Sequence, residues 1–238
     1  MDLDWDEAAR WLAVPSGRVR MARLPRPSFN IAPGRTVAIA VQDVRGERYL
    51  TGASWSLVPR WSAGADLGYP TYNARVESIA GKPTFAASTR SMRAVVPASG
   101  YYEWKGGRGG RPFYFHSPDG SPLAMAGLYS WWRPGVDGAW RLTATVVTCA
   151  AVDGPAGVHR RMPLLVPASM MDVWLDPRVN GAGLLGPLVD AGAGLSRMLR
   201  FHEVAPLPDP EPGSPDGPAL VRPRRPRRDE PASQPSLF

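Results

Sequence analysis

The 238-residue chain is poor in the residues that build disulfides, metal sites and membrane anchors. Its one cysteine, Cys149, excludes an internal disulfide and any cluster of thiolate ligands. The three histidines, His116, His159 and His202, are scattered and lack the spacing of a zinc site, so we expect no metal ion or other cofactor. No apolar run is long enough to span a bilayer, and the acidic, amphipathic start differs from a secretory or transit peptide. These absences predict a soluble, cytoplasmic protein.

Lysine is also scarce. It occurs only at Lys82 and Lys105, so nearly all of the positive charge comes from arginine, and the formal net charge is +7. This balance suits an anionic partner, because side chains that neutralise phosphates release condensed counterions. A GC-rich genome would produce the same bias toward Arg, Gly, Ala and Pro. Charge alone therefore leaves nucleic-acid binding and coding bias equally open.

Residues 1–205 have the pattern of one α+β domain, in which 44% hydrophobic residues over the whole chain allow a substantial core. Helices are expected at Asp4–Leu12, at about residues 86–93 and 168–175, and near residues 184–189. The expected strands are Thr36–Val41, Tyr49–Leu57, Arg93–Trp104, Pro112–His116, Leu123–Trp131, Trp140–Ala150, Pro163–Val166 and a closing strand at Leu199–Val204. Gly and Pro clusters between these runs, at residues 106–110 and 117–120, suit antiparallel hairpins. The pattern predicts a bent, barrel-like, mostly antiparallel sheet flanked by short helices.

The composition changes after Ala205. The stretch Pro206–Pro235 is dense in Pro, Arg, Asp, Glu and Ser and almost without large apolar side chains. Such a segment buries too little surface to offset its ordering entropy, so we expect residues 206–238 to form a disordered tail. The tail carries a basic block, Arg222–Arg228, that either adds sequence-independent phosphate contacts or only improves solubility.

Three short segments of the domain combine polar residues with hydrophobic or turn surroundings: Tyr72–Ser78, Ser99–Lys105 and His159–Pro163. In the second, Glu103 stands among aromatic residues, which could raise its pKa and let it exchange a proton near neutral pH. In the third, His159 could shuttle a proton. Each has a plain structural alternative, since a glutamate at a strand end is most often solvated or paired, and a lone loop histidine is more often structural.

The same segments contain an amide and several guanidinium groups. Asn73 could orient a substrate through its donor and acceptor, although it could also merely cap a turn. Three arginines could hold phosphates, bidentately in favourable geometry. These are Arg75, Arg160 and Arg161.

Taken in order, the motifs resemble those of one family. Asn-Ala-Arg-x-Glu at residues 73–77, Gly-Tyr-Tyr-Glu-Trp-Lys at 100–105 and His-x-Arg-Met-Pro at 159–163 resemble the SRAP family, the SOS response-associated peptidases that process abasic sites in DNA. Phe-Asn-Ile-Ala-Pro-Gly at 29–34 and Trp-Ser-Leu-Val-Pro-Arg-Trp at 55–61 are similar to two further family segments, with Ser56 where glycine is usual. The resemblance covers nearly everything before the tail.

The resemblance implies the SRAP fold and a cleft that binds single-stranded DNA and receives an abasic sugar. In the family, an N-terminal cysteine condenses through its α-amine with the sugar aldehyde, and its thiol then closes a thiazolidine ring. By matching motifs, Asn73 would orient the reactants, Glu103 would act as acid and base, and His159 would assist proton transfer. Arg75 and Arg161 would grip phosphates, with Arg160 as a further candidate. Weaker candidates for lining the cleft are Trp61 and Thr148.

The family's Met-Cys-Gly-Arg start is missing, because this chain begins Met1-Asp2-Leu3. Either the true start lies several residues upstream, which we favour because a helix is expected almost at once, or the chain is a paralogue without covalent chemistry. Cys149 is no replacement: it lies in an apolar strand and has no adjacent α-amine. The alternatives to a covalent abasic-site protein are therefore a non-covalent DNA-damage binding module and a cysteine-type peptidase, which would also need the missing cysteine.

The last five residues, Gln-Pro-Ser-Leu-Phe, resemble the motif that binds the bacterial sliding clamp. Large apolar residues at the end of a polar tail are otherwise poorly explained, although a five-residue match can arise by chance. The clamp-binding candidates are Gln234, Leu237 and Phe238. The expected partners are thus abasic single-stranded DNA and the polymerase clamp, for a monomer associated with the nucleoid.

Overall fold

A computed structural model describes residues 3–107, 109–211 and 213–224. The strands are β1 (Thr36–Gln42), β2 (Arg48–Trp55), β3 (Asn73–Arg75), β4 (Arg93–Ala98), β5 (Gly100–Lys105), β6 (Arg111–His116), β7 (Leu123–Trp132), β8 (Arg141–Ala150), β9 (Arg161–Pro163) and β10 (Arg200–Glu203). The helices are α1 (Trp5–Trp11), α2 (Pro83–Ser91), α3 (Asp153–Ala156), α4 (Ala168–Leu175) and α5 (Leu185–Met198), with 3₁₀ turns at 16–18, 21–23, 181–184 and 218–221. In this part of the chain, no helix is both long and apolar enough to cross a membrane.

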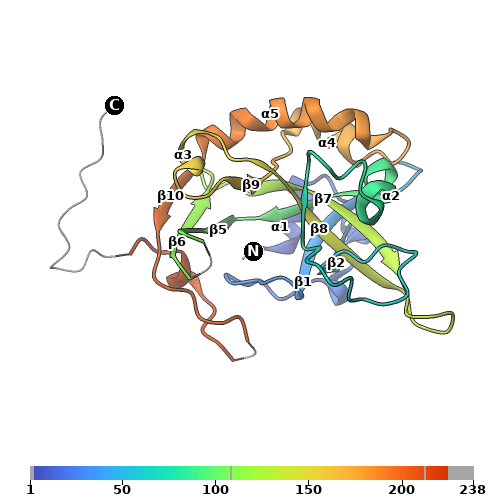
Figure 1. The fold of residues 1–238 in the computed structure, drawn as a ribbon, viewed down its shortest axis with the longest axis horizontal. Coiled ribbons are helices and arrows are strands. Elements are labelled where there is room, and N and C mark those ends of the chain that lie inside the picture. Colours follow the sequence, from blue (N-terminus) through green and yellow to red (C-terminus); the bar gives the residue numbers. More distant parts are fainter. Residues whose placement is uncertain (1–2, 108, 212, 225–238) are drawn as a thin grey trace.

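Five strands close into a mixed β-barrel, which confirms the expected α+β, barrel-like architecture (Figure 1). The order β2-β1-β4-β7-β8 runs through antiparallel pairs, and a parallel pairing of β2 with β8 closes the ring. Two further short strands pair with β8: β3 in parallel and β9 antiparallel. Alternate residues of the barrel strands form two hydrophobic clusters, one made mainly of strand residues and one shared with α1, α2, α4 and α5.

The expected strand Arg93–Trp104 is two strands in different sheets. β4 lies in the barrel and ends at Ala98, whereas β5 pairs with β6 and β6 with β10 in a separate three-stranded sheet. The break falls at Ser99-Gly100. For the same reason the hairpin expected at Ser117–Gly120 is wrong, because β6 and β7 belong to different sheets. The hairpin at Gly106–Gly110 is confirmed, and Gly106, Gly107 and Gly109 all have positive φ there.

Helix α1 forms where the sequence predicts it. The Asp4 side chain accepts hydrogen bonds from the backbone N–H groups of Asp6 and Glu7, both at 2.9 Å, and so caps the first turn. Its apolar stripe, including Trp5 and Leu12, is buried in the core. Of the other helices, α4 has the expected bounds, α2 begins before the expected residue 86, and α5 is much longer than the weak signal near residues 184–189 suggested.

The described part of the C-terminal segment lies against the domain, which its composition did not lead us to expect. Asn30 donates a hydrogen bond to the carbonyl of Pro208 at 2.9 Å, and the backbone N–H of Phe29 donates to the Asp216 carboxylate at 2.7 Å. At the end of the described chain, the N–H of Arg224 donates to the Glu203 carbonyl at 2.8 Å. These contacts connect the segment to the loop before β1 and to β10.

Arg93 is a fully buried cation, 1% exposed, that joins the carboxyl ends of α2 and α4. Its hydrogen bonds within the described residues go to backbone carbonyls, several of them at the C-terminal ends of the two helices, where the helix dipoles are negative. Burial lowers the pKa of this guanidinium from its ordinary value. The accepting carbonyls belong to Thr89, Arg90, Trp174, Asp176 and Val179.

We predict that Arg93→Met lowers the free energy of unfolding by about 3 kcal/mol or more, because several buried carbonyls lose their donors. Urea unfolding followed by circular dichroism measures this. Arg90→Ala is the matched control: it removes an exposed arginine three positions earlier and should cost about 0.5 kcal/mol or less. Equal losses in the two variants would contradict a structural role for Arg93.

Candidate functional site

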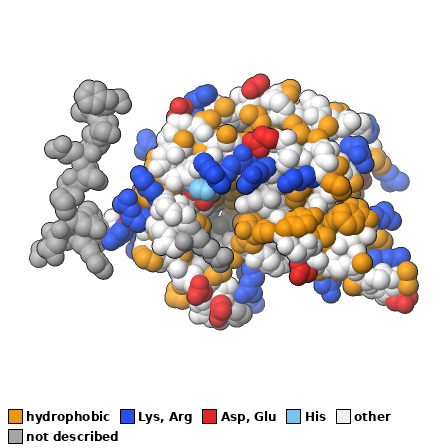
Figure 2. All heavy atoms as spheres, in the orientation of Figure 1, with side chains coloured by type: hydrophobic (Ala, Val, Ile, Leu, Met, Phe, Trp, Pro, Cys, Tyr) orange, Lys and Arg blue, Asp and Glu red, His pale blue; other side chains and the backbone are white. Residues whose placement is uncertain are grey.

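Glu103 and His159 meet although they are far apart in the sequence. Glu103 lies on β5, and His159 lies in the loop between α3 and β9. The Glu103 Oε1 atom is 2.9 Å from His159 Nδ1, and the two side chains are 26% and 35% exposed. Figure 2 shows a hollow in the surface of the molecule, with a histidine and a row of basic side chains beside it. An acid and an imidazole in contact, half-buried but reachable, can pass a proton to a bound molecule.

The glycine that begins β5 allows this strand to approach β6. A Cβ atom at Gly100 would lie 2.3 Å from the Phe115 carbonyl oxygen and 2.5 Å from Cζ of Tyr114, so no larger residue fits. Next to it, the ring of Tyr101 stacks on Phe115 with centroids 4.9 Å apart. The aromatic residues of the motif thus fix β5 on β6 and set the position of Glu103, which pairs with Phe113.

Burial raises the pKa of Glu103 above its ordinary value, and the nearby His159 opposes the shift only in part. His159 Nδ1 lies near two acceptors, Glu103 Oε1 at 2.9 Å and the Arg161 carbonyl oxygen at 3.0 Å. Because these two acceptors are closer than the Arg161 N–H at 3.3 Å, we assign the imidazole proton to Nδ1 while Glu103 is ionised, which leaves Nε2 as an acceptor. A proton delivered to either residue is then shared by the pair.

The one thiol of the chain is unsuited to nucleophilic attack. Cys149 is 3% exposed, and burial raises the pKa of its thiol to about 11. Tyr101 is a second buried group here: its hydroxyl has no hydrogen-bond partner among the described residues. Burial raises the pKa of this phenol, and the charge of Glu103 adds to the effect. Both groups stay neutral at physiological pH.

Arg161 ties β9 to the segment after β3. Its Nη1 and Nη2 atoms donate to the two carboxylate oxygens of Glu77 at 2.7 and 3.0 Å, and Nη2 also donates to the Thr148 carbonyl oxygen at 2.6 Å. These hydrogen bonds hold the pKa of Glu77 below its ordinary value. Because the Arg161 carbonyl oxygen also accepts from His159 Nδ1, the same residue positions the imidazole.

Asn73 and Arg75 lie on β3, the other neighbour of β8 at Thr148. Both side chains are exposed, while Ala74 between them is buried, and Glu77 follows in the turn after the strand. Asn73 and Arg75 therefore lie on the opposite side of β3 from the buried Ala74. Among the described residues, however, no hydrogen bond joins Asn73 to Glu103 or His159, and its role stays a prediction.

The remaining candidates are arranged differently. Arg160 is exposed and, within residues 3–107, 109–211 and 213–224, has no ion-pair partner. Trp61 is 61% exposed, and its indole donates to the Pro83 carbonyl at 3.4 Å, at the start of α2 rather than at the Glu103–His159 pair. Gln234, Leu237 and Phe238 lie outside the described residues.

The sequence analysis did not assign a role to Glu77 or Tyr101. The signal for Glu77 was its place in the Asn-Ala-Arg-x-Glu motif, although the structure puts it in the turn after β3 and not on the strand. For Tyr101 the sequence carried no comparable signal, since its burial depends on the stacking of β5 on β6.

Comparisons with known proteins identify the family of the chain. Residues 3–206 match the model of the family described as SOS response associated peptidase (SRAP). The chain is 31% identical over 166 residues to the abasic site processing protein YoaM of Bacillus subtilis, covering 69% of this chain and 72% of that protein. It is also 31% identical over 182 residues to the abasic site processing protein YedK of Escherichia coli, covering 76% and 78%.

Two solved structures show a similar fold. A protein from Bacteroides thetaiotaomicron aligns with a TM-score of 0.74 and 21% identity, over 94% of this chain and 98% of that one. A phage-related protein from Bordetella bronchiseptica aligns with a TM-score of 0.60 and 28% identity, over 76% and 83%.

We predict that Glu103→Gln is more stable than the native protein at neutral pH. The folded-state pKa of Glu103 lies above 4.5, so its carboxylate destabilises the fold as the pH rises past that value, and a neutral amide avoids this cost. The difference should vanish below about pH 4 in urea unfolding. Glu77→Gln is the matched control of opposite sign: the pKa of Glu77 is lowered, so the variant should be less stable at neutral pH. A less stable Glu103→Gln at pH 7 would refute burial as the dominant effect.

Proposed function

The chain belongs to the SOS response associated peptidase family, and from this premise we propose that it binds single-stranded DNA and processes abasic sites. The observation that carries the proposal is the 2.9 Å contact between the partly exposed side chains of Glu103 and His159. Its relatives are named abasic site processing proteins, which supports abasic DNA as the substrate. Glu103, His159 and Asn73 would be the catalytic residues.

An abasic sugar opens to an aldehyde, and an amine that adds to it gives a carbinolamine. Loss of water to form the imine requires a proton on the departing hydroxyl, which the Glu103–His159 pair would supply and later recover. Asn73 would orient the sugar through its amide. The thiol that would close a thiazolidine on this imine belongs to an N-terminal cysteine, which the sequence beginning at Met1 does not contain.

Arg75 and Arg160 are the better placed of the proposed phosphate contacts. Both are exposed and, within the part of the chain that the structure describes, unpaired with acidic groups. Arg161 would bind phosphate only by sharing or leaving Glu77, so its larger contribution would be to position His159. Thr148 would act through its carbonyl contact with Arg161, and Trp61 would line the outer part of the cleft.

We predict that the protein binds a single-stranded oligonucleotide with one abasic site more tightly than the same strand with an intact base. Asn73→Ala and His159→Ala should each reduce this preference about 10-fold, which corresponds to one lost hydrogen bond of about 1.4 kcal/mol. Native gel shifts measure it, and His116→Ala, a histidine of β6, is the control. Without an N-terminal cysteine the shifted band should disappear on denaturation. Equal affinity of the native protein for the abasic strand and the intact strand would contradict the proposed function.

We also propose that the C-terminal Gln234, Leu237 and Phe238 bind the polymerase sliding clamp. Residues 225–238 follow Arg224, which is fixed to β10, so they would tether the domain to replicating DNA and raise its local concentration there. The basic block at Arg222–Arg228 would add phosphate contacts beside this tether.

Leu237→Ala and Phe238→Ala should each weaken clamp binding about 10-fold or more, because each removes an apolar side chain from a pocket. Isothermal titration of purified clamp with the full chain measures this. Ser233→Ala, just before the motif, should leave the affinity unchanged. An unchanged clamp affinity in the combined variant Leu237→Ala/Phe238→Ala would contradict clamp binding through these residues.

A further inference from the structure

A second basic cluster lies away from the Glu103–His159 pair, where the chain turns from β7 into β8. We define the Trp140 cluster as Arg60, Arg133 and Trp140. The guanidinium carbons of Arg60 and Arg133 lie 5.2 and 5.0 Å from the centroid of the Trp140 ring. The indole is 45% exposed, and both arginines are exposed. The aromatic ring attracts both cations and so holds two like charges close together.

The charges of this cluster are not neutralised by the protein. Among the described residues, neither Arg60 nor Arg133 forms an ion pair with a carboxylate, and Asp137 is the acidic residue of the adjoining turn. Two unpaired guanidinium groups around one ring repel each other. An anion between or beside them would relieve this repulsion.

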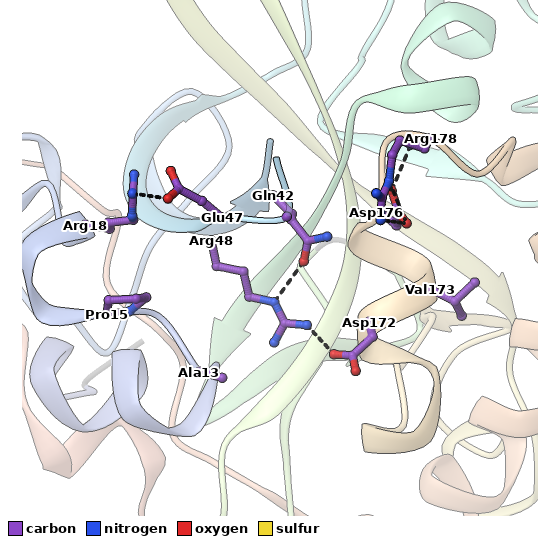
Figure 3. A pocket seen from close by; sticks show the side chains of 11 residues that line it. Ala13, Pro15, Arg18, Gln42, Glu47, Arg48, Asp172, Val173, Asp176 and Arg178 are labelled. Carbon is purple, nitrogen blue, oxygen red and sulfur yellow. Dashed lines mark hydrogen bonds and ion pairs between the residues drawn. The ribbon is translucent and has the colours of Figure 1, made fainter. Parts of the chain in front are cut away.

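A cavity of about 680 Å³, lined by residues of the β1–β2 hairpin and of α4, provides a contrast (Figure 3). It is also rich in arginine, but each guanidinium there has an acidic partner, so the cavity offers little net charge to an anion. The pairs are Arg18–Glu47, Arg48–Asp172 and Arg178–Asp176. The Trp140 cluster differs because its arginines are held by an indole instead of a carboxylate.

The cluster and the candidate site lie at opposite ends of β8. Arg161 pairs with Ala150 at the end of this strand, and Trp140 immediately precedes its first residue, Arg141. Ten residues of extended strand span about 33 Å. Basic side chains form a broken row across the face between the hollow and the side on which the β7–β8 turn projects (Figures 1 and 2).

We propose that Arg60 and Arg133 are a second contact point for the phosphate backbone of the bound DNA strand, a proposal that rests on the proposed function. At about 3.4 Å per nucleotide along a stacked strand, DNA reaches the cluster roughly ten nucleotides from the lesion. The contact is to phosphates, since both arginines lie over the ring on which a base would otherwise stack. It is therefore independent of sequence and sensitive to salt.

The test compares two single-stranded oligonucleotides with a central abasic site, one with about three flanking nucleotides on each side and one with about twenty. The long strand reaches the cluster and the short one does not. In the double variant Arg60→Ala/Arg133→Ala, the slope of log affinity against log salt concentration should fall by about 1.4 for the long strand, at about 0.7 per lost contact. For the short strand, slope and affinity should be unchanged.

One control keeps the positive charge at the cluster, and the other removes a positive charge from another part of the surface. Arg60→Lys/Arg133→Lys retains both charges and should retain most of the slope, and Arg10→Ala, an exposed arginine of α1, should behave as the native protein. An unchanged slope for the long strand in the alanine variant overturns the proposal, as does an equal loss for both strands. Failure of the proposed function would look different: the native protein would not prefer the short abasic strand over its intact counterpart.

Discussion

The ion pair between Arg161 and Glu77 connects the motifs on which the candidate site depends. β3 and β9 bring them to opposite edges of β8, and neither strand is longer than three residues, so their own ladder hydrogen bonds are few. The guanidinium of Arg161 crosses β8 and binds both oxygens of Glu77, while its backbone reaches His159. A bidentate pair of this kind fixes direction as well as distance. The imidazole therefore meets Glu103 in one orientation.

The two carboxylates of the site are shifted in opposite directions for different purposes. Arg161 stabilises the anionic form of Glu77, and this ion pair fixes the position of Arg161. Glu103 is destabilised as an anion by burial against β6, and it is available for proton transfer. The position that serves chemistry is thus the one that weakens the fold, and the compensation comes from the hydrophobic packing of the barrel and of Tyr101 on Phe115.

The barrel architecture, most strands and helices α1 and α4 could be predicted, because they follow alternation, capping and helical spacing. The change of sheet at Ser99-Gly100 could not, since β4 and β5 follow each other with one residue between them and only their partner strands separate them. The three residues of β3 are too few for a periodic signal, and the fixed segment before Arg224 depends on backbone contacts that composition does not reveal. Glu103 and His159 were singled out from their surroundings in the sequence and given roles through family motifs, whereas their contact is a property of the folded chain.

The buried guanidinium of Arg93 couples helices α2 and α4 rigidly to each other. It binds the last carbonyls of both α2 and α4, so neither helix can slide along its axis without breaking hydrogen bonds made by the other. Trp61 is attached to the opposite end of α2 through Pro83. A molecule that bound against this indole would therefore have to move α2 and α4 together to displace it. The position of Trp61 is thus as rigid as these two helices and more rigid than that of an isolated loop.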